Sequence, residues 1–458
     1  MFLTLFAAYA ATLGLNATPG ARFTDREAHV LLSAASIVDD GTLDLRDEYA
    51  GRRWESFYRG ELTPTAGLTN GRLLEPQGVG FPVLIAPAYL VGGATGVELF
   101  LAALMALGFC LAAALARRLV PDPWPTGAAL AAGLSPPALG AATTVSPEVA
   151  GAVLLSLGAI FALRVRDRVR VSSAFWCALC AALAPWMAVT LVVPAAVIAF
   201  ALARWLRRRN RGLTGFVAVE VALTSAVVFI TVNDRLYGGL TPDAARLRGE
   251  PGFTGAGSVG EHLRRAPRLV GLWLDRDVGM LRWAPFAALA FVAVWLLWRS
   301  RRDRVATAVP DRVDVEVTAL FLVLLCGAVL VVAAFLAPTD AGPWFPGHAL
   351  VPALPAGAAL AAWGLQHAPR VGGALAVLTA GAGAWLLVAV RLGHGAALQP
   401  PRGTLPWGGL EDVLPRFGVG SAGETVVLVA AGVALVAVVL RQVLVVRARP
   451  GARPVLLP

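Results

Sequence analysis

The sequence predicts an all-α membrane protein that crosses the bilayer about twelve times, and three observations support this. First, 57% of the 458 residues are hydrophobic and 15% are charged, whereas about a quarter of the residues in soluble domains are charged. Second, apolar runs long enough to span a bilayer recur along the chain. Third, arginines gather in alternate short loops between these runs, as in cytoplasmic loops of membrane proteins. The net charge of +10 therefore indicates membrane orientation, and no nucleic-acid partner is expected.

The first apolar segment, residues 2–17, is expected to be an uncleaved helix because it lacks the positively charged start of a signal peptide. Residues 80–90 are too short and too rich in proline to span, so they are expected to lie at the membrane interface or to re-enter. The other predicted spans share an apolar composition and a length near that of a bilayer: 97–116, 126–145, 148–163, 171–187, 189–205, 213–232, 280–298, 316–336, 349–365, 371–390 and 425–446.

The arginine pattern predicts one membrane-embedded domain over residues 1–458, with both termini in the cytoplasm. The long loops then all lie on the outer face of the plasma membrane: 18–96 with its interfacial helices, 233–279 and 391–424. This outer face is the predicted working face. Glu220 is the one acid deep in an apolar run, and we expect it to face another helix.

Acidic residues follow the first predicted helix, in the stretch Phe23 to His29. Asp25 or Thr24 is a suitable helix cap. ATP and nucleotide sugars are absent outside a bacterial cell, so chemistry there must use substrates delivered through the bilayer. A carboxylate at the membrane surface can deprotonate an acceptor hydroxyl while cations hold a lipid-linked phosphate leaving group. Asp25 and Glu27 are therefore the candidate catalytic bases, although composition alone would also permit a transporter.

Short motifs follow in a fixed order. They are Glu27 to Leu32, Asp40 to Leu45, Gly78 to Pro82 with Ala86 to Tyr89, Ser146-Pro147-Glu148, Ala184-Pro185-Trp186, Leu274 to Leu281 with Ala284-Pro285, and Trp344 to His348 with Pro352 and Pro355. Over about residues 1–360 this order resembles the GT-C superfamily of polyprenyl-phosphate-sugar glycosyltransferases, on the branch of protein O-mannosyltransferases and lipid A aminoarabinose transferases. Two positions depart from the pattern: Arg26 replaces one of two adjacent acids, and His348 replaces an arginine.

The resemblance implies an inverting transfer of a sugar from an undecaprenyl- or decaprenyl-phosphate carrier. The acceptor on the outer face would be a protein hydroxyl, a glycan or a glycolipid. Asp25 or Glu27 would act as the base, and Glu148 as a second acid that steers the acceptor. The alternatives are a polytopic transporter or lipid flippase, and a non-catalytic GT-C-like protein that binds carrier lipid.

Other candidate site residues fall into two groups. Those expected to bind the lipid phosphate are cationic, because arginine forks match phosphate oxygens: Arg264, Arg265, Arg268, Arg276, Arg282 and His348. Those expected to line a sugar or lipid groove are His29, Tyr89 and Trp344. No histidine and acid cluster predicts a metal site, so no cofactor is expected, with a divalent cation left open.

Overall fold

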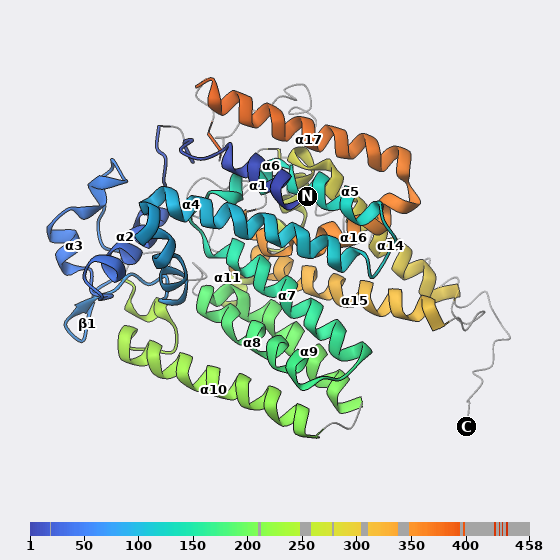
Figure 1. Ribbon diagram of the computed structural model, residues 1–458, viewed down its shortest axis with the longest axis horizontal. Coiled ribbons are helices and arrows are strands. Elements are labelled where there is room, and N and C mark those ends of the chain that lie inside the picture. Colours follow the sequence, from blue (N-terminus) through green and yellow to red (C-terminus); the bar gives the residue numbers. More distant parts are fainter. Residues whose placement is uncertain are drawn as a thin grey trace.

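The protein is almost entirely helical in its computed structural model (Figure 1). The structure describes residues 1–18, 20–208, 212–247, 258–276, 279–303, 310–337, 348–393 and 397–398, with four isolated positions beyond them. Within these ranges the only strands, β1 (Leu68–Thr69) and β2 (Arg72–Leu73), form one antiparallel hairpin. Apart from those four positions, the predicted span 425–446 lies outside the described residues, as does nearly all of the predicted loop 391–424.

Seven helices in the described part of the chain are long and apolar enough to cross a membrane. Their helical cores are α4 (Gly80–Ala116), α7 (Pro147–Asp167), α9 (Val192–Arg208), α10 (Gly212–Tyr237), α15 (Pro310–Val331), α16 (Leu354–His367) and α17 (Pro369–Arg391). Two shorter apolar helices, α8 (Val171–Met187) and α14 (Ala288–Asp303), complete the bundle. The prediction of an all-α, multi-pass membrane protein is confirmed.

Proline and glycine explain where the helices depart from the predicted spans. The run at 126–145 is not one span but two short helices, α5 (Trp124–Gly133) and α6 (Pro136–Ala142). Consecutive prolines at 136 and 137 end the first helix, because proline lacks an amide donor and restricts the residue before it. The predicted first span is also shorter, since α1 covers only Phe2–Ala10.

The segment expected at the membrane interface does form a helix, and it continues into the next span as the first part of α4. Gly92 and Gly93 leave helical geometry between the two parts, with φ of +58° at Gly93. A left-handed φ is readily adopted by glycine alone. The break sets off residues 80–91 as an arm, called the α4 arm below.

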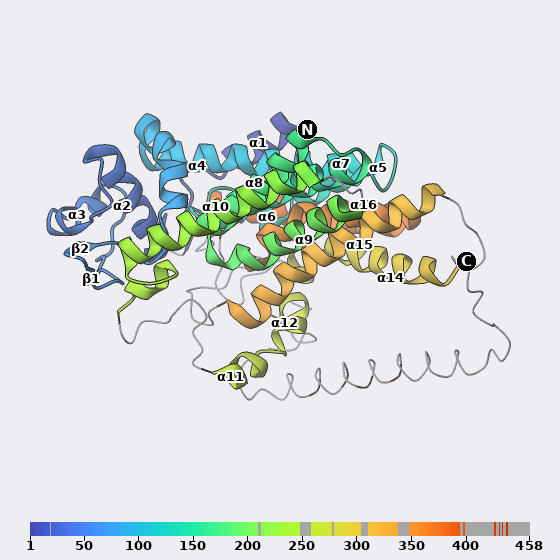
Figure 2. The same cartoon turned by 90° about the horizontal axis from the view of Figure 1, so that it is seen from below.

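The remaining short elements surround the ends of the bundle. Near the N-terminus they are α2 (Asp25–Asp39), α3 (Arg46–Ala50) and the 3₁₀ helix η1 (Arg53–Ser56). Later they are η2 (Val189–Leu191), η3 (Pro242–Ala245), α11 (Val259–Arg264), α12 (Arg268–Leu274), α13 (Met280–Trp283), η4 (Pro285–Ala287), the π-helical turn η5 (Val332–Leu336) and η6 (His348–Ala353). Figure 1 places α2, α3 and β1 together at one end of the bundle, and Figure 2 shows α11 and α12 projecting beside it.

The interior of the bundle is built on α7, which packs against α4, α8 and α9, and on α16, which packs against α14, α5 and α4. Small residues allow these helices to approach closely, as is usual between helices in membranes. A Cβ at Gly364 of α16 would lie 2.4 Å from the carbonyl oxygen of Leu289 in α14. By contrast, α10 and α17 lie at opposite edges of the bundle in Figure 1.

Candidate active site

The N-terminus of α2 carries the acidic motif, and its first turn is fixed by a capping box. The Thr24 hydroxyl accepts a hydrogen bond from the Glu27 amide at 3.3 Å. In return, the Thr24 amide and hydroxyl each donate to Oε2 of Glu27 at 2.8 Å. This reciprocal pairing satisfies amide groups that a helix start otherwise leaves without partners.

Glu27 is also bonded to a distant part of the chain. Its Oε1 accepts a hydrogen bond of 2.8 Å from the amide of Val145, in the loop before α7. The residue is 3% exposed. Burial raises the pKa of this carboxyl, and the hydrogen bonds from Thr24 and Val145 partly oppose that rise. Glu27 therefore fastens α2 to the start of α7.

Asp25 lies in a different environment from Glu27, although both belong to the first turn of α2. Its side chain is exposed, and Oδ1 accepts a hydrogen bond from the Tyr58 hydroxyl. Burial and this bond raise the pKa of Tyr58 to about 12, so the phenol keeps its proton and acts as a donor near neutral pH. Asp25 is thus the solvent-facing carboxylate of the motif.

Arg26 contacts the second predicted acid, Glu148. The distance from Nη2 of Arg26 to Oε1 of Glu148 is 3.9 Å, and the arginine side chain is 52% exposed. Glu148 is buried in the first turn of α7, directly after Pro147. The structure thus brings together the two sequence motifs that contain Asp25 and Glu148. Asp25, Arg26, Glu27 and Glu148 are called the carboxylate cluster below.

A second ion pair beside the cluster was not predicted from the sequence. Arg22 donates to both carboxylate oxygens of Glu98, at 3.2 and 2.5 Å, and to the hydroxyl of Thr95 at 2.8 Å. Glu98 is 2% exposed and lies on α4, one turn beyond the break at Gly92 and Gly93. An acid within an otherwise apolar run was the available sequence signal for this pair.

His29 belongs to a buried polar network that was also only partly predicted. Its Nδ1 lies 2.7 Å from the Tyr49 hydroxyl, which donates to Oε1 of Glu75 at 2.6 Å. Thr65 donates to the same carboxylate through its amide and its hydroxyl. Burial and the negative charge of Glu75 raise the pKa of Tyr49 well above its usual value. The network joins α2 to α3 and to the chain before α4, so these contacts place His29 among structural groups.

Two of the arginines expected to bind phosphate contact backbone carbonyls at the end of η5. Arg265 donates to the carbonyls of Phe335 and Ala337 at 3.2 Å, and Arg268 donates to Ala337 at 2.9 Å. The ring of His262 lies 2.9 Å from the Phe335 carbonyl. Cations suit the carbonyl end of a helix. These contacts attach the large loop to the end of α15 and η5.

The other predicted phosphate-binding residues are spread along this region. Arg264 is exposed at the end of α11, and Arg276 is half-buried after α12. Arg282 is buried in α13, which packs against α6, and α6 leads directly to the loop that bonds Glu27. Arg282 is thus connected to the carboxylate cluster through the contact of α13 with α6. His348 begins η6, and its side chain lies outside the description.

The aromatic candidates have different outcomes. Tyr89 is half-buried in the α4 arm and packs against the main hydrophobic core. Trp344 lies outside the described residues.

Glu220, which was expected to face another helix, is instead exposed on α10 and accepts only a long hydrogen bond of 3.4 Å from Thr224. Because α10 lies at the edge of the bundle, this acid cannot belong to a central relay.

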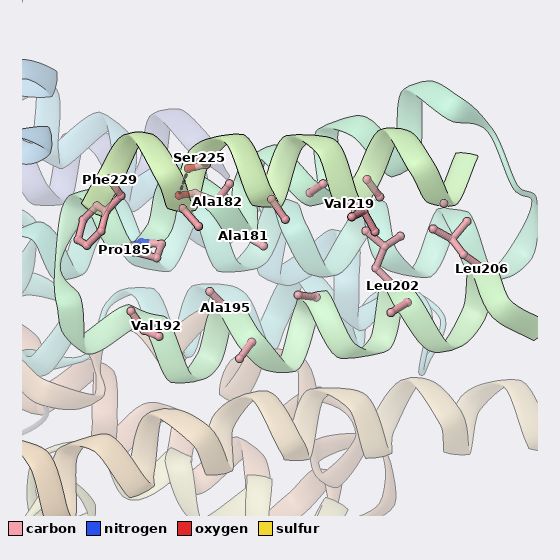
Figure 3. A pocket seen from close by; sticks show the side chains of 18 of the residues that line it. Ala181, Ala182, Pro185, Val192, Ala195, Leu202, Leu206, Val219, Ser225 and Phe229 are labelled. Carbon is pink, nitrogen blue, oxygen red and sulfur yellow. Dashed lines mark hydrogen bonds between the residues drawn. The ribbon is translucent and has the colours of Figure 1, made fainter. Parts of the chain in front are cut away.

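An apolar groove runs along three neighbouring helices, α8, α9 and α10 (Figure 3). Its volume is about 760 Å³, and Ser225 and Arg207 are the polar residues in its lining. On α9 the lining extends from Val192 to Arg207, about 22 Å at 1.5 Å per residue. This length is most of the thickness of a bilayer's hydrocarbon core. We call this feature the α8–α10 groove.

One end of the α8–α10 groove is connected to the carboxylate cluster through a short series of contacts. Trp186 packs edge-on against Phe229 with ring centroids 5.2 Å apart, and its Nε1 donates to Ser225 at 3.3 Å. A Cβ at Gly80 would lie 2.3 Å from the carbonyl oxygen of Trp186, so only glycine permits the α4 arm to start here. Just before the arm, Gln77 donates to the Arg26 carbonyl at 3.5 Å.

Among the described residues, no group of three or more histidine, cysteine, aspartate or glutamate side chains is arranged to hold a metal ion. The four cysteines are free thiols. The absence of a metal requirement stays a prediction.

Comparisons with known proteins give one structural likeness. No protein-family model matches the chain, and no curated protein matches it. Among solved structures, the chain is similar to ArnT from Cupriavidus metallidurans, whose crystal structure was determined with bound undecaprenyl phosphate. The two are 15% identical, with a TM-score of 0.46, and the match covers 85% of this chain and 71% of ArnT.

Proposed function

We propose that the protein is a membrane glycosyltransferase of the GT-C type that transfers a sugar from a polyprenyl-phosphate carrier to an acceptor hydroxyl. The observation that carries the proposal is the position of the carboxylate cluster beside one end of the α8–α10 groove. A polyprenyl-phosphate sugar has a polar head and a long apolar chain. The carboxylate cluster suits the head, and the α8–α10 groove suits the chain. The ordered sequence motifs from Asp25 to Trp186 give independent support.

In this proposal Asp25 is the catalytic base. Its carboxylate is exposed, and the Tyr58 hydroxyl holds one of its two oxygens in place. Glu27 is less suited to this role because it is buried and accepts bonds from three donors in Thr24 and Val145. A base needs an accessible lone pair within reach of the proton that it removes.

The proposed reaction is a single displacement. Asp25 takes the proton of the acceptor hydroxyl while that oxygen attacks the anomeric carbon of the donor. The bond between this carbon and the phosphate oxygen breaks, so the anomeric configuration inverts and polyprenyl phosphate leaves. A cation beside the phosphate stabilises the developing negative charge, and Arg282 is our candidate because α13 packs on α6. We place the reaction on the outer face of the plasma membrane, as the arginine pattern predicts.

The experiment is a transfer assay with purified protein in lipid nanodiscs. Radiolabelled polyprenyl phosphomannose and phosphoarabinose are supplied with a membrane extract as the source of acceptors, and wild type is compared with Asp25→Asn and Glu27→Gln. We expect wild type to transfer or hydrolyse one of the donors and Asp25→Asn to be nearly inactive.

Two results would contradict the proposal in different ways. Binding of the donor lipid without any transfer or hydrolysis would favour the non-catalytic lipid-binding alternative. Movement of a solute or lipid across the membrane without turnover would favour a transporter.

A further inference from the structure

Ser146 is the N-cap residue of α7, yet its side chain does not cap the helix. Serine at this position usually accepts a hydrogen bond from an amide in the first turn, which stabilises a helix by about 1 kcal/mol. Here the residue is 5% exposed, and its hydroxyl oxygen has no hydrogen-bond partner among the described residues. A buried hydroxyl without a partner destabilises a protein, so such groups often mark a binding or catalytic role.

The neighbours of Ser146 belong to the carboxylate cluster. The amide of Val145 bonds Glu27, and Glu148 contacts the exposed Arg26. Ser146 therefore lies between the two points at which α7 meets α2. The contact between Arg26 and Glu148 is long, at 3.9 Å, and the Arg26 side chain is half exposed whereas Glu148 is buried.

Other hydroxyl groups nearby show that Ser146 is unusual within this part of the fold. Thr144 donates to the Gly140 carbonyl at 2.6 Å, and Ser156, one-half of α7 away, donates to the Ala152 carbonyl at 2.7 Å. Both are buried, and each donates to the backbone carbonyl four residues earlier. A helix start with amide donors, a buried hydroxyl and an adjacent carboxylate can both donate and accept hydrogen bonds, which suits a polyhydroxylated ligand.

We propose that the Ser146 hydroxyl, at the N-terminus of α7 beside Glu148, binds a hydroxyl of the sugar that the carrier delivers. This inference rests on the proposed function, because the sugar is taken to be the transferred group. Ser146 is then a sugar-positioning residue: it distinguishes the sugar-bearing carrier from the bare polyprenyl phosphate and does not move a proton itself.

The test compares two lipids that differ only in the sugar, polyprenyl phosphomannose (or phosphoarabinose) and polyprenyl phosphate. Binding of each to wild type, Ser146→Ala, Ser146→Thr and the control Ser156→Ala is measured in nanodiscs, together with thermal unfolding without ligand. We expect Ser146→Ala to weaken binding of a sugar-bearing lipid by roughly 3- to 10-fold, leave binding of the bare phosphate unchanged and not lower the unfolding temperature. Ser146→Thr should retain the preference for the sugar.

The control Ser156→Ala should lower the unfolding temperature, because it removes a bond that the folded protein makes, and should leave the sugar preference unchanged. Unchanged sugar preference in Ser146→Ala, or a loss of thermal stability in that variant like that of Ser156→Ala, would overturn the inference while leaving the proposed function intact. If wild type binds neither lipid, the proposed function fails, and this inference fails with it.

Discussion

The carboxylate cluster and the α8–α10 groove lie near each other but differ in polarity: the cluster is charged, and the groove is apolar. In the cluster, Glu27 accepts three hydrogen bonds and Arg26 contacts Glu148. In the groove, the lining is almost wholly aliphatic or aromatic carbon, with Ser225 and Arg207 as its polar residues. Charged groups are unfavourable among lipid chains unless they are paired, and no acid is among the described residues that line the groove. In the proposed function this difference in polarity corresponds to the head and chain of an amphiphilic substrate, and each region can be altered separately.

Replacing the exposed acid of the cluster should have the largest effect. Asp25→Asn keeps the shape of the side chain and can still accept the Tyr58 hydrogen bond, but it cannot take a proton. We expect the transfer rate to fall by about 10²- to 10⁴-fold with little change in unfolding temperature. Asp47→Asn, another exposed acid in the same region, is the control and should keep the wild-type rate. Equal rates for Asp25→Asn and wild type would exclude Asp25 as the base.

Replacing the buried acid should act first on stability. Glu27→Ala leaves the Val145 amide and the Thr24 donors without their acceptor, which should destabilise the fold by about 2–4 kcal/mol. Unfolding in mixed detergent micelles measures this change, and Glu55→Ala, at an exposed acid on η1, should lie within about 0.5 kcal/mol of wild type. A stable Glu27→Ala variant would show that this carboxylate does not fasten α2 to α7.

Filling the groove should affect lipid binding alone. Ala222 is an exposed residue of α10 that lines the groove, so Ala222→Phe should weaken binding of polyprenyl phosphate by about 10-fold, or about 1.4 kcal/mol. The control Ala374→Phe changes an exposed alanine of α17, at the opposite edge of the bundle. Equal affinities of the two variants would indicate that the carrier chain lies elsewhere.

A pH titration should give the smallest effect. Because the pKa of Glu27 is raised in the folded protein, the folded state binds more protons than the unfolded state between the ordinary and the raised pKa. Protonation of Glu27 therefore adds to the free energy of unfolding. This contribution is fully present when the pH is below the carboxyl pKa of the unfolded chain, and it is lost as the pH rises through the higher pKa of the folded protein. Unfolding temperatures of Glu27→Gln should depend less on pH across this interval than those of wild type, and parallel curves would contradict the assignment.

Composition and periodicity were sufficient to predict the helical membrane fold, because a long apolar run in a membrane has few alternatives to forming a spanning helix. They could not predict the bond from Val145 to Glu27, which joins residues 118 positions apart. They also could not predict which groups Arg265 and Arg268 bind, because the carbonyl groups that accept their hydrogen bonds are placed by tertiary packing of η5. Glu98 was detectable as an isolated acid in an apolar run, but its partner Arg22 was not. Local sequence therefore located the acidic motif, and only the fold distinguished its exposed acid from its buried one.

The most direct test is whether one substrate uses both regions at once. Turnover of undecaprenyl-phosphate and geranyl-phosphate sugars is compared in wild type and Ala222→Phe. We predict that wild type turns over the long-chain donor at least about 10-fold more efficiently, that Ala222→Phe loses most of this preference, and that the rate with the short donor is unchanged. If Ala222→Phe retains the full preference, or if neither donor is turned over, then the claim that the carboxylate cluster and the groove serve one lipid-linked sugar is wrong.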